Sequence, residues 1–90
     1  MKLDDALFNW LQIRVVADAR PHDRSAADTA DFFEEILIHD HQVSALAYEA
    51  DGDSYLLHCR VNGEARTQRY DRERVDALLV AIENEPKFNE

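Results

Sequence analysis

Histidine and aspartate residues cluster at two places in the chain, where they could bind a divalent metal. His22 stands beside Asp23, and His39, Asp40 and His41 are consecutive. Imidazole and carboxylate groups suit zinc, iron or manganese, and a metal-bound water can act as a hydrolytic nucleophile. The sequence holds neither a His-Glu-x-x-His motif nor paired Cys-x-x-Cys motifs. A divalent-metal hydrolase is therefore an alternative hypothesis, which requires His22 to converge with His39 or His41 in the fold.

Carboxylates are concentrated between the two histidine clusters, at Asp28, Asp31, Glu34 and Glu35. A pair of carboxylates performs acid–base catalysis only in a partly desolvated cleft that shifts the pKa of one member. Here Asp31 and Glu35 are one helical turn apart, a spacing at which like charges slightly destabilise a helix. The pattern indicates an exposed acidic face, and we expect Asp31, Glu34 and Glu35 to contact a basic partner.

The segment between residues 60 and 74 is net basic and contains five arginines: Arg60, Arg66, Arg69, Arg72 and Arg74. Guanidinium groups bind carboxylate or phosphate in a bidentate geometry. The whole chain has a net charge of −9, and the predicted surface lacks the aromatic side chains on which single-stranded nucleic acid stacks. We therefore expect Arg60, Arg69 and Arg72 to contact another protein or a second copy of the chain. A weak nucleic-acid binder is a second alternative.

A single cysteine and two glycines leave little material for other kinds of active site. Cys59 falls in a predicted strand whose alternation points the adjacent His58 to the opposite face, so we interpret Cys59 as a packing residue. Gly52 and Gly63 fall in predicted turns. No phosphate-binding loop, G-x-S-x-G motif or dinucleotide fingerprint is present. The sequence therefore predicts no catalytic residue and no cofactor.

The composition is that of an ordinary globular protein. Its 90 residues suffice for one domain, and 46% are hydrophobic and 32% charged. No apolar run approaches the length of about 20 residues that spans a membrane. Acids at Asp4 and Asp5 are atypical of a secretory signal, so we expect a cytoplasmic protein without a membrane partner. Residues 1–53 hold 12 of the 19 acids but only 4 of the 10 lysines and arginines, so the N-terminal half is strongly acidic.

Apolar residues recur at helical spacing in three segments. The first helix spans residues 3–20, with Asp4 or Asp5 as its cap. β-Branched residues between positions 13 and 16 lie off its main apolar stripe, so this helix is either buried on more than one side or locally irregular. The second opens at Asp23 or Ser25 and ends near position 39; its stripe comprises Ala26, Ala30, Phe33 and Leu37, widened by Phe32 and Ile36. The third follows Asp71 and ends at Pro86, leaving residues 87–90 as a loose tail.

Three short strands are predicted between the second and third helices, over residues 43–50, 55–61 and 64–70. They are joined at Asp51-Gly52 and Asn62-Gly63, which are the commonest two-residue hairpin signals. The three strands therefore form an antiparallel meander.

The two turns predict the register of this meander. A two-residue loop at Asp51-Gly52 places Tyr48 opposite Tyr55 and Leu46 opposite Leu57, and the second turn places Tyr55 opposite Tyr70. The three tyrosines then form one cross-strand row on the face that helices cover. The opposite face, with His58, Arg60, Thr67 and Arg69, meets water.

The predicted fold is a two-layer α+β domain of order α-α-β-β-β-α, spanning residues 1–86. The charge segregation and the missing catalytic motifs favour a small cytoplasmic protein-interaction or regulatory module without catalytic activity, which can self-associate. If a pocket forms, we expect it at the loop of residues 20–25 or at the hairpin ends.

Overall fold

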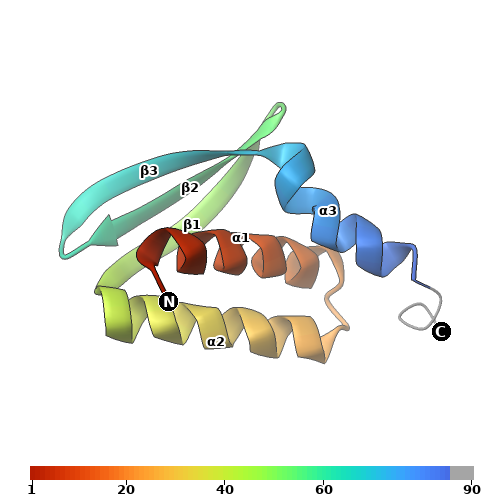
Figure 1. Cartoon of the computed structure of the whole chain (residues 1–90), viewed down its shortest axis with the longest axis horizontal. Coiled ribbons are helices and arrows are strands. Elements are labelled where there is room, and N and C mark those ends of the chain that lie inside the picture. Colours follow the sequence, from red (N-terminus) through yellow and green to blue (C-terminus); the bar gives the residue numbers. More distant parts are fainter. Residues whose placement is uncertain (86–90) are drawn as a thin grey trace.

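The computed structural model describes residues 1–85 and confirms the predicted α+β order. The three strands form one antiparallel sheet in the order β1-β2-β3. Figure 1 shows α1 between the sheet and α2, and it shows α3 past the end of the sheet, beside the C-terminal part of α1. The elements are α1 (Leu3–Ala19), α2 (Arg24–His41), β1 (Val43–Asp51), β2 (Ser54–Val61), β3 (Glu64–Asp71) and α3 (Arg72–Glu83). The tail predicted for residues 87–90, and Pro86, lie outside the described residues.

Helix α1 is the centre of the fold. Leu7 and Leu11, one turn apart on the same side, are completely buried, and so is Val16 on another side of the helix. The sheet and Leu37 of α2 pack on one part of its surface, and Ala26 and the end of α3 pack near Val16. Of the two sequence interpretations, burial on more than one side is therefore correct, and the helix continues without interruption to Ala19.

The helix ends follow local rules with one exception. The Asp23 side chain accepts a hydrogen bond from the Ala26 N–H and begins α2, and Asp71 accepts from Arg74 N–H and begins α3. The predicted cap of α1 by Asp4 or Asp5 is wrong, because the N-cap residue is Lys2 and no side chain caps it. Asp4 and Asp5 lie in the first turn instead, where their charges complement the helix dipole.

The second hairpin turn forms as predicted, but the first does not. Asn62 and Gly63 both have positive φ, of 52° and 83°, as a type I′ turn requires. In the first hairpin Asp51 pairs with Ser54, so Gly52 and Asp53 form the loop, and of these two only Gly52 has a positive φ. Glycine in the first central position is the signature of a type II′ turn.

This change of turn moves the register of β1 by two residues. Tyr48 pairs with Leu57 rather than with Tyr55, whereas the predicted pair of Tyr55 with Tyr70 is confirmed. A shift of two residues keeps the side chains from Ala47 to Asp51 on their predicted faces. Tyr48 therefore still lies beside Tyr55, with their rings edge to face and their centroids 5.8 Å apart. Leu46 does not pair with Leu57, because the β1–β2 register shifts between Ser44 and Ala47.

A β-bulge explains that irregularity. Ala45 lies within it with φ of 51°, a left-handed conformation that is unfavourable for a residue with a Cβ. From Ala47 to Asp51 the ladder with β2 is regular. The regular half of β1 is therefore the half that adjoins the first hairpin turn.

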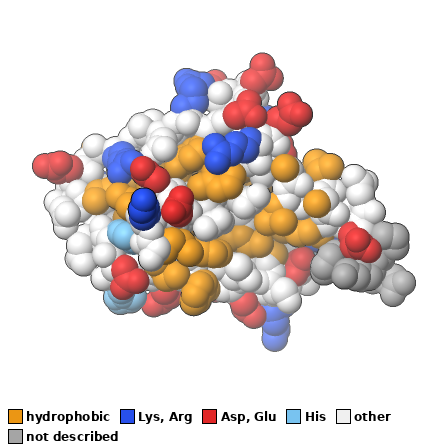
Figure 2. All heavy atoms as spheres, viewed as in Figure 1, with side chains coloured by type: hydrophobic (Ala, Val, Ile, Leu, Met, Phe, Trp, Pro, Cys, Tyr) orange, Lys and Arg blue, Asp and Glu red, His pale blue; other side chains and the backbone are white. Residues whose placement is uncertain are grey.

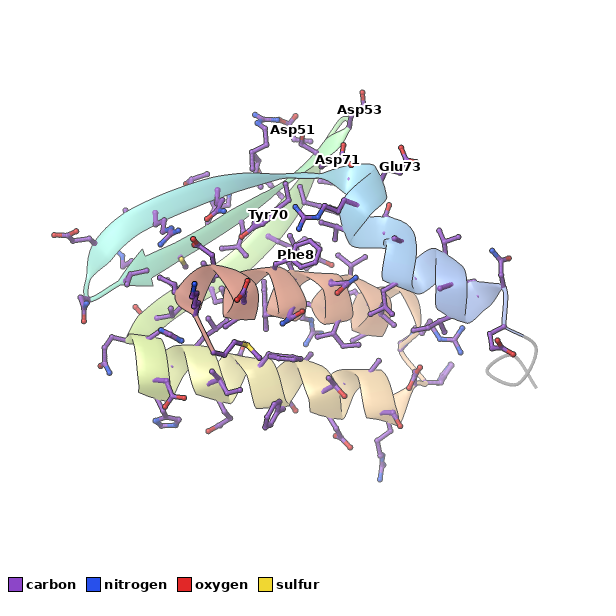
Figure 3. All side chains as sticks on the ribbon, in the orientation of Figure 1. Phe8, Asp51, Asp53, Tyr70, Asp71 and Glu73 are labelled. Carbon is purple, nitrogen blue, oxygen red and sulfur yellow. The ribbon has the colours of Figure 1, made fainter. Side chains whose placement is uncertain are left out.

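The three tyrosines join the helices to the sheet, two of them through hydrogen bonds and one through apolar packing. The Tyr55 hydroxyl donates to Asp76 Oδ1 of α3 at 2.6 Å, and Tyr48 donates to Asp18 of α1. Tyr70 is 9% exposed and packs against Phe8, toward which it points in Figure 3. Within the described chain, the Tyr70 hydroxyl has no hydrogen-bond partner.

Substitution of phenylalanine for each tyrosine removes only the hydroxyl, and we expect the effect on stability to differ between Tyr55 and Tyr70. We expect Tyr55→Phe to lower the free energy of unfolding by about 1.5–3 kcal/mol, because it removes a hydrogen bond to a carboxylate. Tyr70→Phe should leave stability unchanged or raise it by up to about 1 kcal/mol, because it removes an unpaired buried hydroxyl. Urea denaturation of both variants checks this, and a larger loss in Tyr70→Phe than in Tyr55→Phe would contradict it.

Candidate interaction surfaces

Of the arginines predicted to bind a partner, Arg60 and Arg69 lie on the sheet and Arg72 begins α3, and the fold itself contacts each of them. Arg60 Nη1 donates to the Gly63 carbonyl at 3.0 Å. Arg69 Nη1 lies 3.4 Å from Asp51 Oδ2 across the outer face of the sheet. Arg72 Nε lies 3.6 Å from Asp76 Oδ2 and its guanidinium lies 5.2 Å from the centre of the Tyr55 ring. All three side chains are exposed; carboxylates of the same chain partly compensate the charges of Arg69 and Arg72, whereas Arg60 bonds to an uncharged carbonyl.

Two matching groups of side chains join the helices to the sheet. In the first, which we call the Tyr48 bridge, Arg14 and Tyr48 both donate to Asp18. In the second, the Tyr55 bridge, Tyr55 donates to Asp76, and Arg72 lies beside the same carboxylate. Each bridge combines an Arg–Asp pair one helical turn apart with a tyrosine from the sheet. The structure thus uses Arg72 first as a structural residue.

The hydrogen bonds of the Tyr48 bridge change the acidity of its members. Partial burial raises the pKa of Asp18, but the bonds from Arg14 and Tyr48 outweigh it, so that pKa lies below its ordinary value. Burial, followed by the bond to Asp18, raises the pKa of the Tyr48 hydroxyl. The hydroxyl therefore stays protonated and donates throughout the physiological pH range.

The outward face of α2 is acidic, as predicted, and it also carries an exposed aromatic residue. Asp28, Asp31 and Glu35 are all exposed, whereas Glu34 is half-buried. Phe32 is 59% exposed, although the sequence predicted that it widens the buried stripe. That prediction is wrong because Ala26, Ala30, Phe33 and Leu37 already fill the contact with α1 and the core.

The carboxylates of α2 have few cationic neighbours. Glu35 Oε2 lies 3.1 Å from His39 Nε2 on the next turn, and both side chains are about 70% exposed. Arg14 interacts electrostatically with Asp31, but it bonds to Asp18. The Phe32 ring packs edge to face against Phe33, with 5.4 Å between centroids, and most of its surface meets solvent. Phe32 and the acids Asp28, Asp31 and Glu35 around it form what we call the α2 face.

The structure does not bring the predicted metal ligands together. His22 precedes α2, whereas His39 and His41 lie in its last turn, about 25 Å along an α-helix. His41 Nε2 contacts the Met1 carbonyl oxygen at 2.9 Å, and His39 pairs with Glu35. Asp40 is exposed. Among residues 1–85 no group of three or more histidine, cysteine, aspartate or glutamate side chains is placed to hold a metal ion.

Hollows occur where the sequence predicted them. One of about 570 Å³ lies between the loop that joins α1 to α2 and Glu83 of α3. A second, of about 510 Å³, adjoins the first hairpin turn and the start of α3, and its lining is mostly acidic. Figure 3 shows the acids Asp51, Asp53, Asp71 and Glu73 gathered at this end of the molecule, and Figure 2 shows acidic side chains on the surface there. Both hollows are open to solvent.

Cys59 is a packing residue in this fold. It is 4% exposed on the face of β2 that α1 covers, and His58 projects from the opposite face. Burial raises the pKa of the Cys59 thiol, although the nearby Arg66 lowers it to a smaller extent. A protonated, buried thiol is a poor nucleophile.

Comparison of the chain with family models, with curated proteins and with solved structures finds no match. Within residues 1–85, no helix is both long and apolar enough to cross a membrane. The argument for function therefore depends on the surfaces themselves.

The Tyr48 bridge should make stability depend on pH. Because the folded-state pKa of Asp18 is lowered, ionised Asp18 stabilises the fold above about pH 4, and this contribution is lost as the pH falls through that pKa. Tyr48→Phe removes one of the bonds that lower the pKa. Between about pH 6 and pH 3 we therefore expect this variant to lose less stability than the wild type. Urea denaturation at a series of pH values checks this. If the free energy of unfolding fell equally with pH in the variant and the wild type, the prediction would be contradicted.

Proposed function

We propose that the protein is a small cytoplasmic protein-interaction module without catalytic activity, and that the α2 face binds a basic partner. The observation that carries this proposal is the exposure of Phe32 among the carboxylates of the α2 face. Aromatic residues surrounded by polar groups supply most of the binding energy in many protein interfaces. The acids supply attraction and orientation, and the ring supplies buried apolar area.

The state of the α2 face in the free protein supports this proposal. Asp31 and Glu35 are both exposed one turn apart, which costs helix stability. A basic partner would relieve that repulsion and cover the Phe32 ring at the same time. Burial of a phenylalanine side chain is worth about 1.5–3 kcal/mol, which corresponds to about tenfold to a hundredfold in affinity.

A different protein suits this face better than a second copy does. The basic residues Arg60 and Arg69 lie on the outer face of the sheet, which α1 separates from α2 (Figure 1). Contact between the sheet of one copy and the α2 face of the next would use two different surfaces. Such contacts build rings or open chains rather than closed two-fold dimers. The charge of Arg69 is also partly compensated by Asp51 of its own chain, and Arg60 bonds to the Gly63 carbonyl.

Substitution of Phe32 tests the proposal. Phe32→Ala should weaken capture of the partner by about tenfold or more, because it removes the apolar anchor. It should hardly change the stability of the fold, since Phe32 is 59% exposed. The measurement is quantitative affinity capture from a lysate of the source cells, followed by titration of the captured protein against each variant.

Val80→Ala provides the matched control, because Val80 is also exposed, at 53%, but lies on α3. The captured protein should bind the Val80→Ala variant as tightly as the wild type, and its affinity should fall with added salt. Equal binding by all three proteins would contradict a role for the α2 face. Failure of the wild type to capture any protein would contradict the proposed function itself.

A further inference from the structure

The free edge of β1 has the features of a strand-addition site. The sheet order leaves β1 unpaired on one side, and six of its nine residues are exposed. Helix α3 packs on β2 and β3. From Ser44 to Ala50, Glu49 is the only charged residue, and three of the other side chains are alanines. Edge strands of this kind accept an additional strand unless charge, proline or a bulge protects them.

The opposite edge of the sheet is protected. Strand β3 carries charged side chains along its length, among them Glu64, Arg66, Arg69 and Asp71. Arg66 Nη2 also binds Asp4 Oδ1 of α1 at 2.7 Å. Charged residues on an edge strand discourage pairing with another chain. In β1 the bulge at Ala45 affects only the first half of the strand, and the charged residues of the second half, Glu49 and Asp51, are both acidic.

The second half of β1 has free backbone hydrogen-bonding groups. Asp51 and Ser54 close a two-residue loop, and the closing pair of such a hairpin is hydrogen-bonded. The ladder from Asp51 back to Ala47 is regular, so the N–H and C=O groups of Glu49 also point toward β2. Those of Tyr48 and Ala50 then point away from the sheet. An incoming strand would bond to these two residues.

The charges around this edge determine the kind of strand that fits. Glu49 and Asp51 lie on the outer side of β1, Asp18 lies beside Tyr48 on the inner side, and Asp53 follows in the turn. Three of these acids are partly compensated within the chain, Glu49 by His58, Asp51 by Arg69 and Asp18 by Arg14. The four carboxylates still outnumber the two arginines, so this edge keeps an acidic surplus. Antiparallel pairing of β1 with β1 of a second copy would bring two such acidic sets together. A strand with basic side chains would complement them.

We propose that the edge of β1 from Ala47 to Asp51 binds an extended segment of a partner protein that carries lysine or arginine at alternate positions. The backbone bonds to Tyr48 and Ala50 supply affinity, and the basic side chains opposite Glu49 and Asp51 supply selectivity. This site is separate from the α2 face, so it does not rest on the function proposed for that face.

The test uses a synthetic eight-residue peptide of alternating valine and lysine, titrated into the ¹⁵N-labelled full-length protein. We expect the largest amide chemical-shift changes at Tyr48 and Ala50, and an affinity that falls with added salt. A peptide of alternating valine and glutamate is the matched control and should not bind. Changes centred on β3 or α2, equal binding of both peptides, or no binding by either would overturn the proposal.

The substitution Ala50→Pro tests the backbone contribution. It removes the outward N–H of Ala50 but leaves the ladder bonds of Glu49 and Asp51 in place. The lysine peptide should bind about tenfold more weakly to this variant. The Phe32→Ala variant should bind it as the wild type does, which separates this edge from the α2 face. If sedimentation showed that the free protein is a dimer, and hydrogen exchange showed that the outward amides of β1 are protected in it, the edge would instead bind a second copy, which would overturn the proposal.

Discussion

Burial of α1 on several sides is the constraint on which the rest of the structure depends. A helix of 17 residues that buries Leu7 and Leu11 on one side and Val16 on another cannot lie at a surface. Helices α2 and α3 each cover one part of it, and side chains of the sheet such as Tyr70 and Tyr48 pack on another part, against Phe8 and Trp10. A chain of 90 residues has few elements with which to do this. The outer face of the sheet and the outer face of α2 are left uncovered as a result.

The two tyrosine bridges attach the helices to the sheet through directed hydrogen bonds. Apolar contact alone is not directional and would not fix how α1 and α3 are oriented on the sheet. Tyr48 links β1 to α1 and Tyr55 links β2 to α3, each through an aspartate that also faces an arginine one turn away. This arrangement uses Arg14 and Arg72 for structure and partly compensates their charge. The acids of the α2 face take part in neither bridge, and this difference supports the binding role that we propose for that face.

The order of elements, the faces of the sheet and the second hairpin could be predicted from sequence, because they follow from periodicity and from Asn62-Gly63. The register of the first hairpin could not, because Asp51-Gly52-Asp53 permits two turn types, and the choice depends on how β1 meets the helices. The acidic character of α2 followed from Asp31 and Glu35, but the exposure of Phe32 depends on the rotation of α2 about its axis. The spacing of Ala26, Ala30, Phe33 and Leu37 was the signal for that rotation. The separation of His22 from His39 and His41 follows from the length of α2.

Hydrogen exchange of the native protein, followed residue by residue, tests most directly the claim that a central helix leaves one sheet edge open. The account predicts that amides of Leu7, Leu11 and Val15 exchange only through global unfolding, because α1 is enclosed on several sides. It predicts that the Tyr48 and Ala50 amides exchange rapidly while the neighbouring Glu49 amide is protected. Exchange of α1 through local opening, or strong protection of Tyr48 and Ala50, would contradict it.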